Sequence, residues 1–204
     1  MTPIETIMRT SPVIPVLVIE DIAHARPIAQ ALVAGGLRVL EVTLRTAGAL
    51  DVIREMKKVD GAIVGAGTVL NEADLRASID AGAEFIVSPG LTEPLGRAAI
   101  ASGIPFLPGI ANAGDIMRGL DMGLSHFKFF PAEASGGISA LKALAAPFGR
   151  CQFCPTGGIT LATAPDWLAI APVLCVGGSW VVGKGMPDVK AIEEAARTCA
   201  ALRP

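Results

Sequence analysis

The chain has 204 residues, of which 51% are hydrophobic and 18% are charged, and its formal net charge is −2. This composition allows a substantial core, but the weak charge gives no basic field for nucleic acid or anionic lipid. No apolar run reaches the roughly 18 residues that span a bilayer, and the N-terminus lacks a signal-peptide pattern. We therefore expect a protein that binds neither nucleic acid nor membrane.

Short β-branched or aromatic runs alternate with Ala/Leu-rich segments, with a period of roughly 20 to 25 residues. The predicted strands span residues 13–19, 38–44, 62–65, 84–87, 105–107, 126–129, 152–154 and 173–176. The predicted helices span residues 22–34, 49–59, 72–81, 93–102, 113–122, 138–146, 161–169 and 189–202. Asn71 and Asp74 have the spacing of a helix cap, and glycines such as Gly82 and Gly103 mark helix ends. No linker interrupts the series, so residues 1–204 are expected to form one domain.

Eight strands alternating with eight helices predict an α/β protein with an all-parallel sheet. Closing eight such units gives a (β/α)₈ barrel, the TIM barrel. A doubly wound open sheet is the alternative, and it usually has a glycine-rich fingerprint after its first strand. Here Glu20 and Asp21 follow the first strand, and Gly65-Ala66-Gly67 lacks the third glycine because residue 70 is leucine. The barrel is therefore favoured.

The four cysteines indicate a reducing compartment rather than a metal site. Cys151 and Cys154 have metal-ligand spacing, but no second such pair or histidine pair completes a zinc site. Cys175 and Cys199 lie in apolar segments. We interpret all four as reduced thiols of a cytoplasmic protein.

One lysine stands in an unusual context. Lys128 lies in a short strand with Phe127, Phe129 and Phe130, whereas the other lysines have solvated helix or loop contexts (Lys57, Lys58, Lys142, Lys184 and Lys190). An unpaired ammonium among aromatic rings is costly unless it loses its proton. A neutral amine in an apolar site attacks carbonyl groups and forms Schiff bases. The residues alone leave this interpretation and a half-exposed, solvated lysine equally open.

The carboxyl ends of the strands are where barrel enzymes build their sites. In the second strand, the period of two places Glu41, Thr43 and Arg45 on one face. These charges could form a salt bridge that fills the barrel. They could instead be a general acid/base beside an arginine that binds a carboxylate.

Glycine pairs follow the last two predicted strands. Gly157-Gly158 follows the seventh strand, and Gly177-Gly178-Ser179 follows the eighth. Glycine lets backbone N–H groups approach an anion, and these two loops form the usual phosphate site of such barrels. The pattern favours a phosphorylated metabolite as ligand.

Six motifs together resemble the 2-keto-3-deoxy-6-phosphogluconate (KDPG) aldolases, class I bacterial aldolases of the Entner–Doudoroff pathway. The similarity extends from about residue 5 to the terminal helix, with the motifs in order. They are Glu-Val-Thr-Leu-Arg-Thr (41–46), Val-Gly-Ala-Gly-Thr-Val-Leu (64–70), Ser-Pro-Gly (88–90), Phe-Lys-Phe-Phe-Pro-Ala-Glu (127–133), Cys-Pro-Thr-Gly-Gly-Ile (154–159) and Val-Gly-Gly-Ser-Trp (176–180).

The resemblance implies a role for each matching residue. Lys128 takes the place of the Schiff-base lysine, and Glu41 faces it as the general acid/base. The remaining family positions bind the substrate: they hold its carboxylate (Arg45, Thr68, Thr156), wall its pocket (Pro89, Phe130) and cradle its phosphate (Gly157, Gly158, Gly178, Ser179). The iminium serves as the electron sink, so the resemblance implies no cofactor and no metal.

The resemblance also implies a phosphorylated 2-keto acid as substrate, with pyruvate and glyceraldehyde 3-phosphate as products, and a homotrimeric assembly. Family members also accept 4-hydroxy-2-ketoglutarate (KHG). Residues 110–113 depart from the more usual Ser/Thr-rich sequence, and His126 is expected to lie in the core rather than in the mechanism.

Three alternatives stay open at this point. A phosphosugar isomerase or epimerase would use the glycine loops but not an apolar lysine. A non-catalytic sensor of phosphorylated metabolites would not need Glu41 beside Lys128. An aldolase for the galactonate epimer would share the chemistry and differ in stereochemical preference.

Overall fold

The computed structural model describes residues 1–183 and 185–202, so Lys184 and its predicted loop context fall outside the described residues. The strands found in these ranges are β1 Val13–Leu17, β2 Val39–Thr43, β3 Ile63–Gly67, β4 Ile86–Val87, β5 Phe106–Leu107, β6 Gly109–Ile110, β7 His126–Phe129, β8 Gln152–Pro155 and β9 Val176–Gly178. The helices are α1 Pro3–Thr10, η1 Ile22–His24 (3₁₀), α2 Ala25–Ala34, α3 Ala49–Met56, α4 Glu72–Asp80, α5 Glu93–Ser102, α6 Ala113–Asp121, α7 Gly137–Ala145, α8 Ala164–Leu168 and α9 Val189–Ala200.

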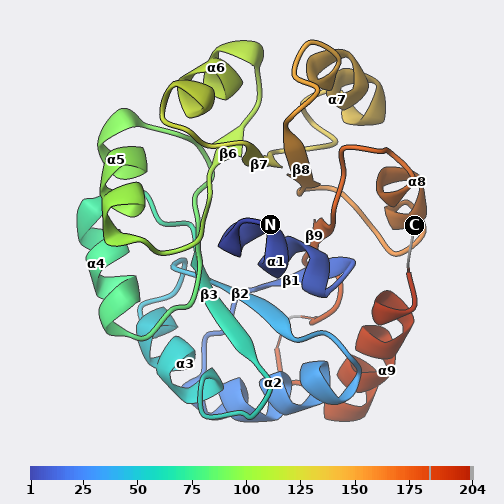
Figure 1. Ribbon diagram of the computed structural model, residues 1–204. Helices are drawn as coiled ribbons and strands as arrows, with labels where there is room; N and C mark the ends of the chain where they lie inside the picture. Colours follow the sequence, from blue (N-terminus) through green and yellow to red (C-terminus); the bar gives the residue numbers. More distant parts are fainter. Residues whose placement is uncertain (184, 203–204) are drawn as a thin grey trace.

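The strands form a closed parallel ring. Six pair in the order β5-β4-β3-β2-β1-β9, and three in the order β6-β7-β8. Only Pro108 separates β5 from β6, so these two act as one interrupted strand. Isolated parallel bridges from Phe153 to Val173 and from Thr156 to Gly177 join β8 to the segment of β9. Eight strand positions and a surrounding ring of helices make the predicted (β/α)₈ barrel (Figure 1).

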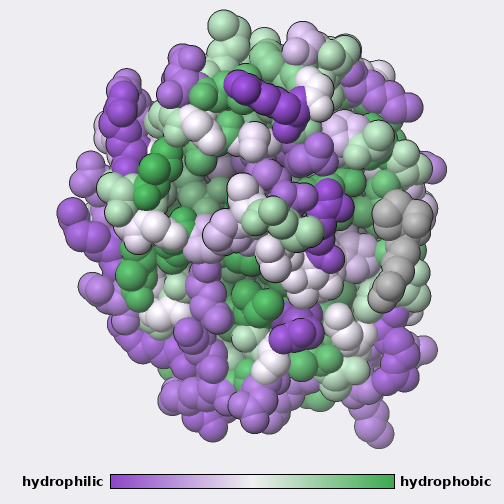
Figure 2. Space-filling model, viewed as in Figure 1, coloured by the Kyte–Doolittle hydropathy of each residue, from purple (hydrophilic) through white to green (hydrophobic). Residues whose placement is uncertain are grey.

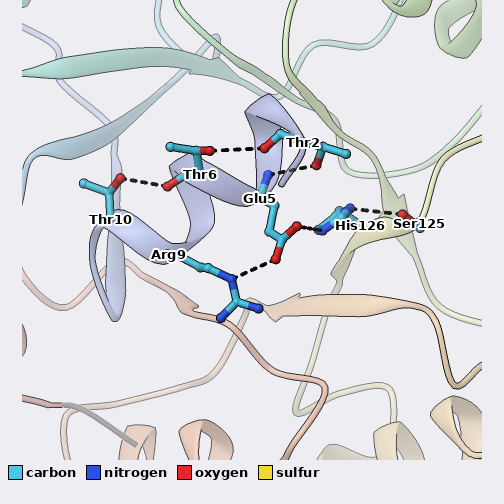
Figure 3. Close-up of polar contacts among 7 residues, drawn as sticks. All are labelled: Thr2, Glu5, Thr6, Arg9, Thr10, Ser125 and His126. Carbon is cyan, nitrogen blue, oxygen red and sulfur yellow. Dashed lines mark hydrogen bonds and ion pairs between the residues drawn. The ribbon is translucent and has the colours of Figure 1, made fainter.

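Helix α1 was not predicted, because the repeating pattern begins only at the first strand. The Thr2 hydroxyl accepts a hydrogen bond from the Glu5 amide at 3.3 Å, and Pro3 begins the helix, which together favour an N-terminus here. The helix lies across the centre of the ring (Figure 1). It packs at the amino ends of the strands, where the Glu5 carboxylate approaches His126 at the start of β7 (Figure 3). It therefore closes the floor of the barrel.

Two hydrophobic clusters divide the core. One cluster fills the space between the strands and the outer helices, and the other lies inside the ring, above α1. Strand alternation assigns Phe127 and Phe129 to the outer cluster, where Phe127 packs against Gly119 of α6 and Phe129 against Trp167 of α8. Lys128 consequently points inward, and two of its three neighbouring phenylalanines face away from it.

Other differences from the predicted elements have local causes. The last strand begins at Val176 rather than at residue 173, because the pairing with β1 starts at Val176. Helix α8 is shorter than the predicted 161–169: mutual hydrogen bonds between Thr160 and Thr163 form a turn there, and Pro165 stands in the first turn of the helix. The cap of α4 is as predicted, with the Asp74 amide donating to the Asn71 side-chain oxygen at 2.9 Å.

The surface is mixed in character. Hydrophilic side chains predominate along much of the outer rim of the face that carries α1, with apolar residues between them (Figure 2). No helix within residues 1–183 and 185–202 combines the length and the apolar character needed to cross a membrane.

Candidate active site

Lys128 and Glu41 form a buried ion pair inside the barrel. The Lys128 Nζ lies 3.0 Å from Glu41 Oε1 and 3.4 Å from Oε2. The residues are only 6% and 3% exposed. The ion pair compensates for the loss of hydration of both charges, which would otherwise be costly to bury. The structure also decides between the partners considered for Glu41, because the carboxylate pairs with Lys128 and not with Arg45.

The environment of Lys128 differs from that of the other lysines in the described residues. Its Nζ lies 5.4 Å from the centroid of the half-buried Phe130 ring, so one aromatic face covers the ammonium. The remaining described lysines are exposed, as expected (Lys57, Lys58, Lys142 and Lys190). A buried lysine paired with a buried carboxylate is a typical arrangement for a functional amine.

Gly67, at the end of β3, makes room for Glu41. A Cβ on Gly67 would lie 2.2 Å from Glu41 Oε1, which is far inside van der Waals contact. The sequence analysis gave this glycine no role of its own. Its position on the inner face of β3, two residues after Gly65, was the available signal, since the inner face alternates along the strand.

Thr156 is buried at the end of β8, beside the segment of β9. The Thr156–Gly177 bridge sets the two strands side by side, and a Cβ on Gly177 would lie 2.2 Å from the Thr156 hydroxyl oxygen. That hydroxyl donates a 3.4 Å hydrogen bond to the Cys154 carbonyl oxygen. Lys128 pairs in register with Cys154, so Thr156 stands one inward position further toward the carboxyl end.

Arg45, Thr68 and Pro89 lie on the loops that follow β2, β3 and β4. Arg45 is exposed, and its guanidinium makes no ion pair or hydrogen bond with residues 1–183 or 185–202. Thr68 has a φ of +60°, a conformation that is strained for a β-branched residue and that is concentrated at functional sites. The Pro89 carbonyl lies over Gly109, which pairs in register with Lys128. The three therefore occupy the same end of the barrel as the ion pair.

The two predicted phosphate loops lie next to each other at the β8–β9 junction. Gly157 and Gly158 have φ values of +105° and +82°, which only glycine adopts readily. Gly178 ends β9, and Ser179 follows it and is exposed. The structure thus places these four residues at the carboxyl ends of two neighbouring strands, although no contact links them directly to Lys128.

Two thiols lie near the ion pair, inside the barrel. Cys154 and Cys175 belong to the inner cluster and are buried. The hydrogen bond with Cys154, burial and the nearby charges of Cys154 and Glu41 raise the pKa of the Cys175 thiol well above its ordinary range. This thiol therefore stays protonated at neutral pH and adds no charge next to Glu41. Among the residues that the structure describes, no group of three or more His, Cys, Asp or Glu side chains could hold a metal ion.

The closed ring and the buried amine–carboxylate pair at its carboxyl end define the chain as a (β/α)₈-barrel enzyme whose site is built around a lysine. Comparison with known proteins narrows this class. The family model described as KDPG and KHG aldolase matches residues 4–195. The chain therefore belongs to the KDPG and KHG aldolase family.

Individual relatives agree with this assignment. The KHG/KDPG aldolase of Escherichia coli is 57% identical over 182 residues, which cover 89% of this chain and 85% of that protein. The crystal structure of the KDPG aldolase of Zymomonas mobilis with 3-phosphoglycerate has a TM-score of 0.98 and 59% identity, covering 98% of this chain and 96% of that one. The Legionella pneumophila KDPG aldolase, with pyruvate captured as a covalent carbinolamine, has a TM-score of 0.92 and 41% identity, covering 98% and 99%.

Proposed function

We propose that this chain is a class I aldolase that cleaves KDPG reversibly to pyruvate and D-glyceraldehyde 3-phosphate. The observation that carries the proposal is the 3.0 Å contact between Lys128 Nζ and Glu41 Oε1. It joins the nucleophile that a Schiff base needs to an acid/base group within direct reach of its proton. The names of the relatives, which include KDPG and KHG, support the same substrate class.

In the proposed reaction, a proton passes from Lys128 to Glu41 and frees the amine. The amine attacks C2 of the substrate, and Glu41 returns its proton to the carbinolamine hydroxyl, which leaves as water and gives the iminium. Glu41 then takes the proton of the C4 hydroxyl while the C3–C4 bond breaks, and the electron pair of that bond moves through C3 and C2 to the iminium nitrogen. Glyceraldehyde 3-phosphate leaves, and Glu41 donates its proton to C3 of the enamine, which restores the iminium. Water then attacks C2, and hydrolysis releases pyruvate and the free lysine.

The other residues are proposed to bind the substrate. Arg45 offers a guanidinium free of the described side chains, and Thr68 and Thr156 offer hydroxyl groups to the same carboxylate. Pro89 and Phe130 would wall the pocket, and the backbone amides of the two glycine loops would hold the phosphate (Gly157, Gly158, Gly178 and Ser179). Because the iminium accepts the electron pair, we propose that the reaction needs neither metal nor cofactor.

Three further parts of the proposal concern a second substrate, the oligomeric assembly and the location in the cell. We propose KHG as a second substrate, because it offers the same 2-keto acid end to Lys128 and the family model carries its name. A homotrimer is proposed from the family resemblance. A cytoplasmic location is proposed because all four cysteines are buried free thiols.

The test is borohydride reduction in the presence of pyruvate, followed by peptide mass spectrometry. We expect a reduced pyruvate adduct on Lys128 in the wild type and none in Lys128→Ala. Cleavage of KDPG should be unaffected by EDTA. Absence of the adduct would refute the Schiff base, and a strong effect of EDTA would indicate a metal-dependent aldolase.

A further inference from the structure

The loop that follows β8 is held from one side by the loop after β7, in which the Ala132 amide donates a 2.8 Å hydrogen bond to the Thr156 carbonyl oxygen and Pro131 lies against Gly157. Glu133, the next residue, adds contacts from both its backbone and its side chain. The Glu133 amide donates a 3.0 Å hydrogen bond to the Gly157 carbonyl oxygen. The Cβ and Cγ of Glu133 pack where a side chain on Gly158 would stand, since a Cβ there would lie 2.7 Å from each. The Glu133 Oε1 accepts a 3.0 Å hydrogen bond from Trp167 Nε1. Glu133 therefore contacts both glycines and also the helix into which their loop leads.

The tryptophan in this contact belongs to the buried core. Trp167 is fully buried in α8, and its ring packs against Phe129 of β7 with centroids 6.3 Å apart. A hydrogen bond from a buried indole to a carboxylate is charge-assisted and stronger than a neutral one. The other oxygen, Oε2, lies 3.5 Å from the position of a Cβ on Gly137, at the first turn of α7, where the helix dipole favours a negative charge. Glu133 is solvent-exposed, yet its Oε1 is held by the indole of a buried tryptophan.

Contacts from neighbouring residues matter for the two glycines because glycine itself restricts the backbone least. With φ values of +105° and +82°, they occupy conformations that glycine enters and leaves easily. Backbone amides bind an anion well only when they already point toward it, since ordering a loop on binding weakens affinity. Glu133 restrains this loop through its own backbone, its aliphatic stem and its carboxylate.

We propose that Glu133 is a positioning residue that holds the Gly157–Gly158 loop in the orientation that binds the phosphate of the substrate. The inference rests on the proposed function and adds a residue that acts on only one end of the substrate. The phosphate end depends on Glu133, whereas the pyruvate end, at Lys128, does not.

The test compares a phosphorylated and an unphosphorylated ligand in the same variants. Glu133→Ala should raise the KM for KDPG roughly tenfold, the effect of losing one hydrogen bond to a charged group. The pyruvate concentration that gives half-maximal borohydride trapping should not change. Trp167→Phe removes the indole donor together with part of the buried ring, and it should also raise the KM for KDPG. The double variant should be little worse than either single one, because the two residues share one contact.

Two comparisons separate position from charge and from general damage. Glu133→Gln keeps an oxygen that can accept a hydrogen bond from Trp167. Its KM for KDPG should therefore be much closer to the wild-type value than that of Glu133→Ala. Glu93→Ala removes an exposed carboxylate on α5 whose one ion pair among the described residues is with Arg97, four residues on, and it should behave as the wild type.

Three results would overturn the proposal: an unchanged KM in Glu133→Ala, equal shifts for KDPG and pyruvate, or a Gln variant as impaired as the Ala variant. Failure of the proposed aldolase function would instead appear in the wild type, as missing KDPG cleavage or missing pyruvate adduct.

Discussion

The carboxylate of Glu41 occupies the space that a side chain on Gly67 would need. A Cβ on Gly67 would stand 2.2 Å from Oε1 and 2.7 Å from Cγ of Glu41, so the ion pair with Lys128 exists only because β3 ends in glycine. The overlapping atoms all belong to the Glu41 side chain, so a Cβ at residue 67 would displace that side chain from its present position. The identity of residue 67 therefore controls the geometry of a contact between two other strands.

Gly67→Ala should move the Glu41 carboxylate away from Lys128. Because general acid/base catalysis contributes about 100-fold or more, we expect kcat for KDPG cleavage to fall by about that factor. Gly48→Ala is the matched control, since a Cβ at Gly48 meets nothing within 4 Å and its φ is −88°. Steady-state kinetics measure the effect. A Gly67→Ala enzyme with wild-type kcat would show that the position of Glu41 is unimportant.

The ion pair should also affect the free energy of unfolding. Glu41→Leu or Lys128→Met leaves the other charge buried without a partner, which lowers the free energy of unfolding by about 3–5 kcal/mol. The double variant replaces both charges with apolar groups, so it should recover most of that loss. Urea denaturation of the four proteins gives the coupling energy. Additive losses in the double variant would contradict a direct pairing.

His126 should make stability depend on pH. Burial lowers its pKa below the ordinary 6.5; the Glu5 carboxylate opposes this shift, and Arg9 adds to it. The unfolded chain therefore takes up a proton near pH 6.5, whereas the folded chain does so only at lower pH. Stability that is complete above pH 6.5 is lost as the pH falls below it, by at most about 1.4 kcal/mol per pH unit.

Urea denaturation of the wild type and His126→Gln between pH 7.5 and pH 5.5 measures this dependence. The variant should lose less stability than the wild type over that range. The same slope in wild type and His126→Gln would exclude His126 as the source.

Thr68 should reveal a conflict between stability and function. Its φ of +60° is unfavourable for threonine and is tolerated far better by asparagine. Thr68→Asn should therefore raise the free energy of unfolding by about 1 kcal/mol. Because the threonine hydroxyl is proposed to bind the substrate carboxylate, the variant should also need more pyruvate for half-maximal trapping. A less stable variant would mean that the conformation is not strained.

The sequence predicted the barrel because strand and helix periodicities repeat with little interruption. The strands at 39–43 and 126–129 were located well, since their alternation is strong. Helix α1 was missed because it lies outside the strand–helix repeat. Its eight residues pack against the amino ends of the strands, which come together only when the barrel is closed. His126 is buried at that floor, as expected of a core residue.

The site was harder to predict from the sequence where it depends on how side chains pack than where it depends on their chemical groups. Charged and polar residues at strand ends identified Glu41 and Lys128, because such residues stand out in apolar strands. The role proposed for Glu133 was not visible, and that of Gly67 was indicated only by its alternation with Gly65, since both depend on which side chain lies across from them in the folded ring. Contacts such as Glu133–Trp167, 34 residues apart, are set by the closure of the barrel rather than by any local pattern.

Between β8 and β9 the barrel is joined by isolated bridges instead of a continuous ladder. The loops proposed to hold the phosphate extend from the two sides of this same junction. An anion bound by both loops would connect the two strands noncovalently. Binding of the anion and closure of the ring would therefore be thermodynamically linked. The protein would then melt at higher temperature when a phosphorylated ligand is present than when pyruvate alone is bound.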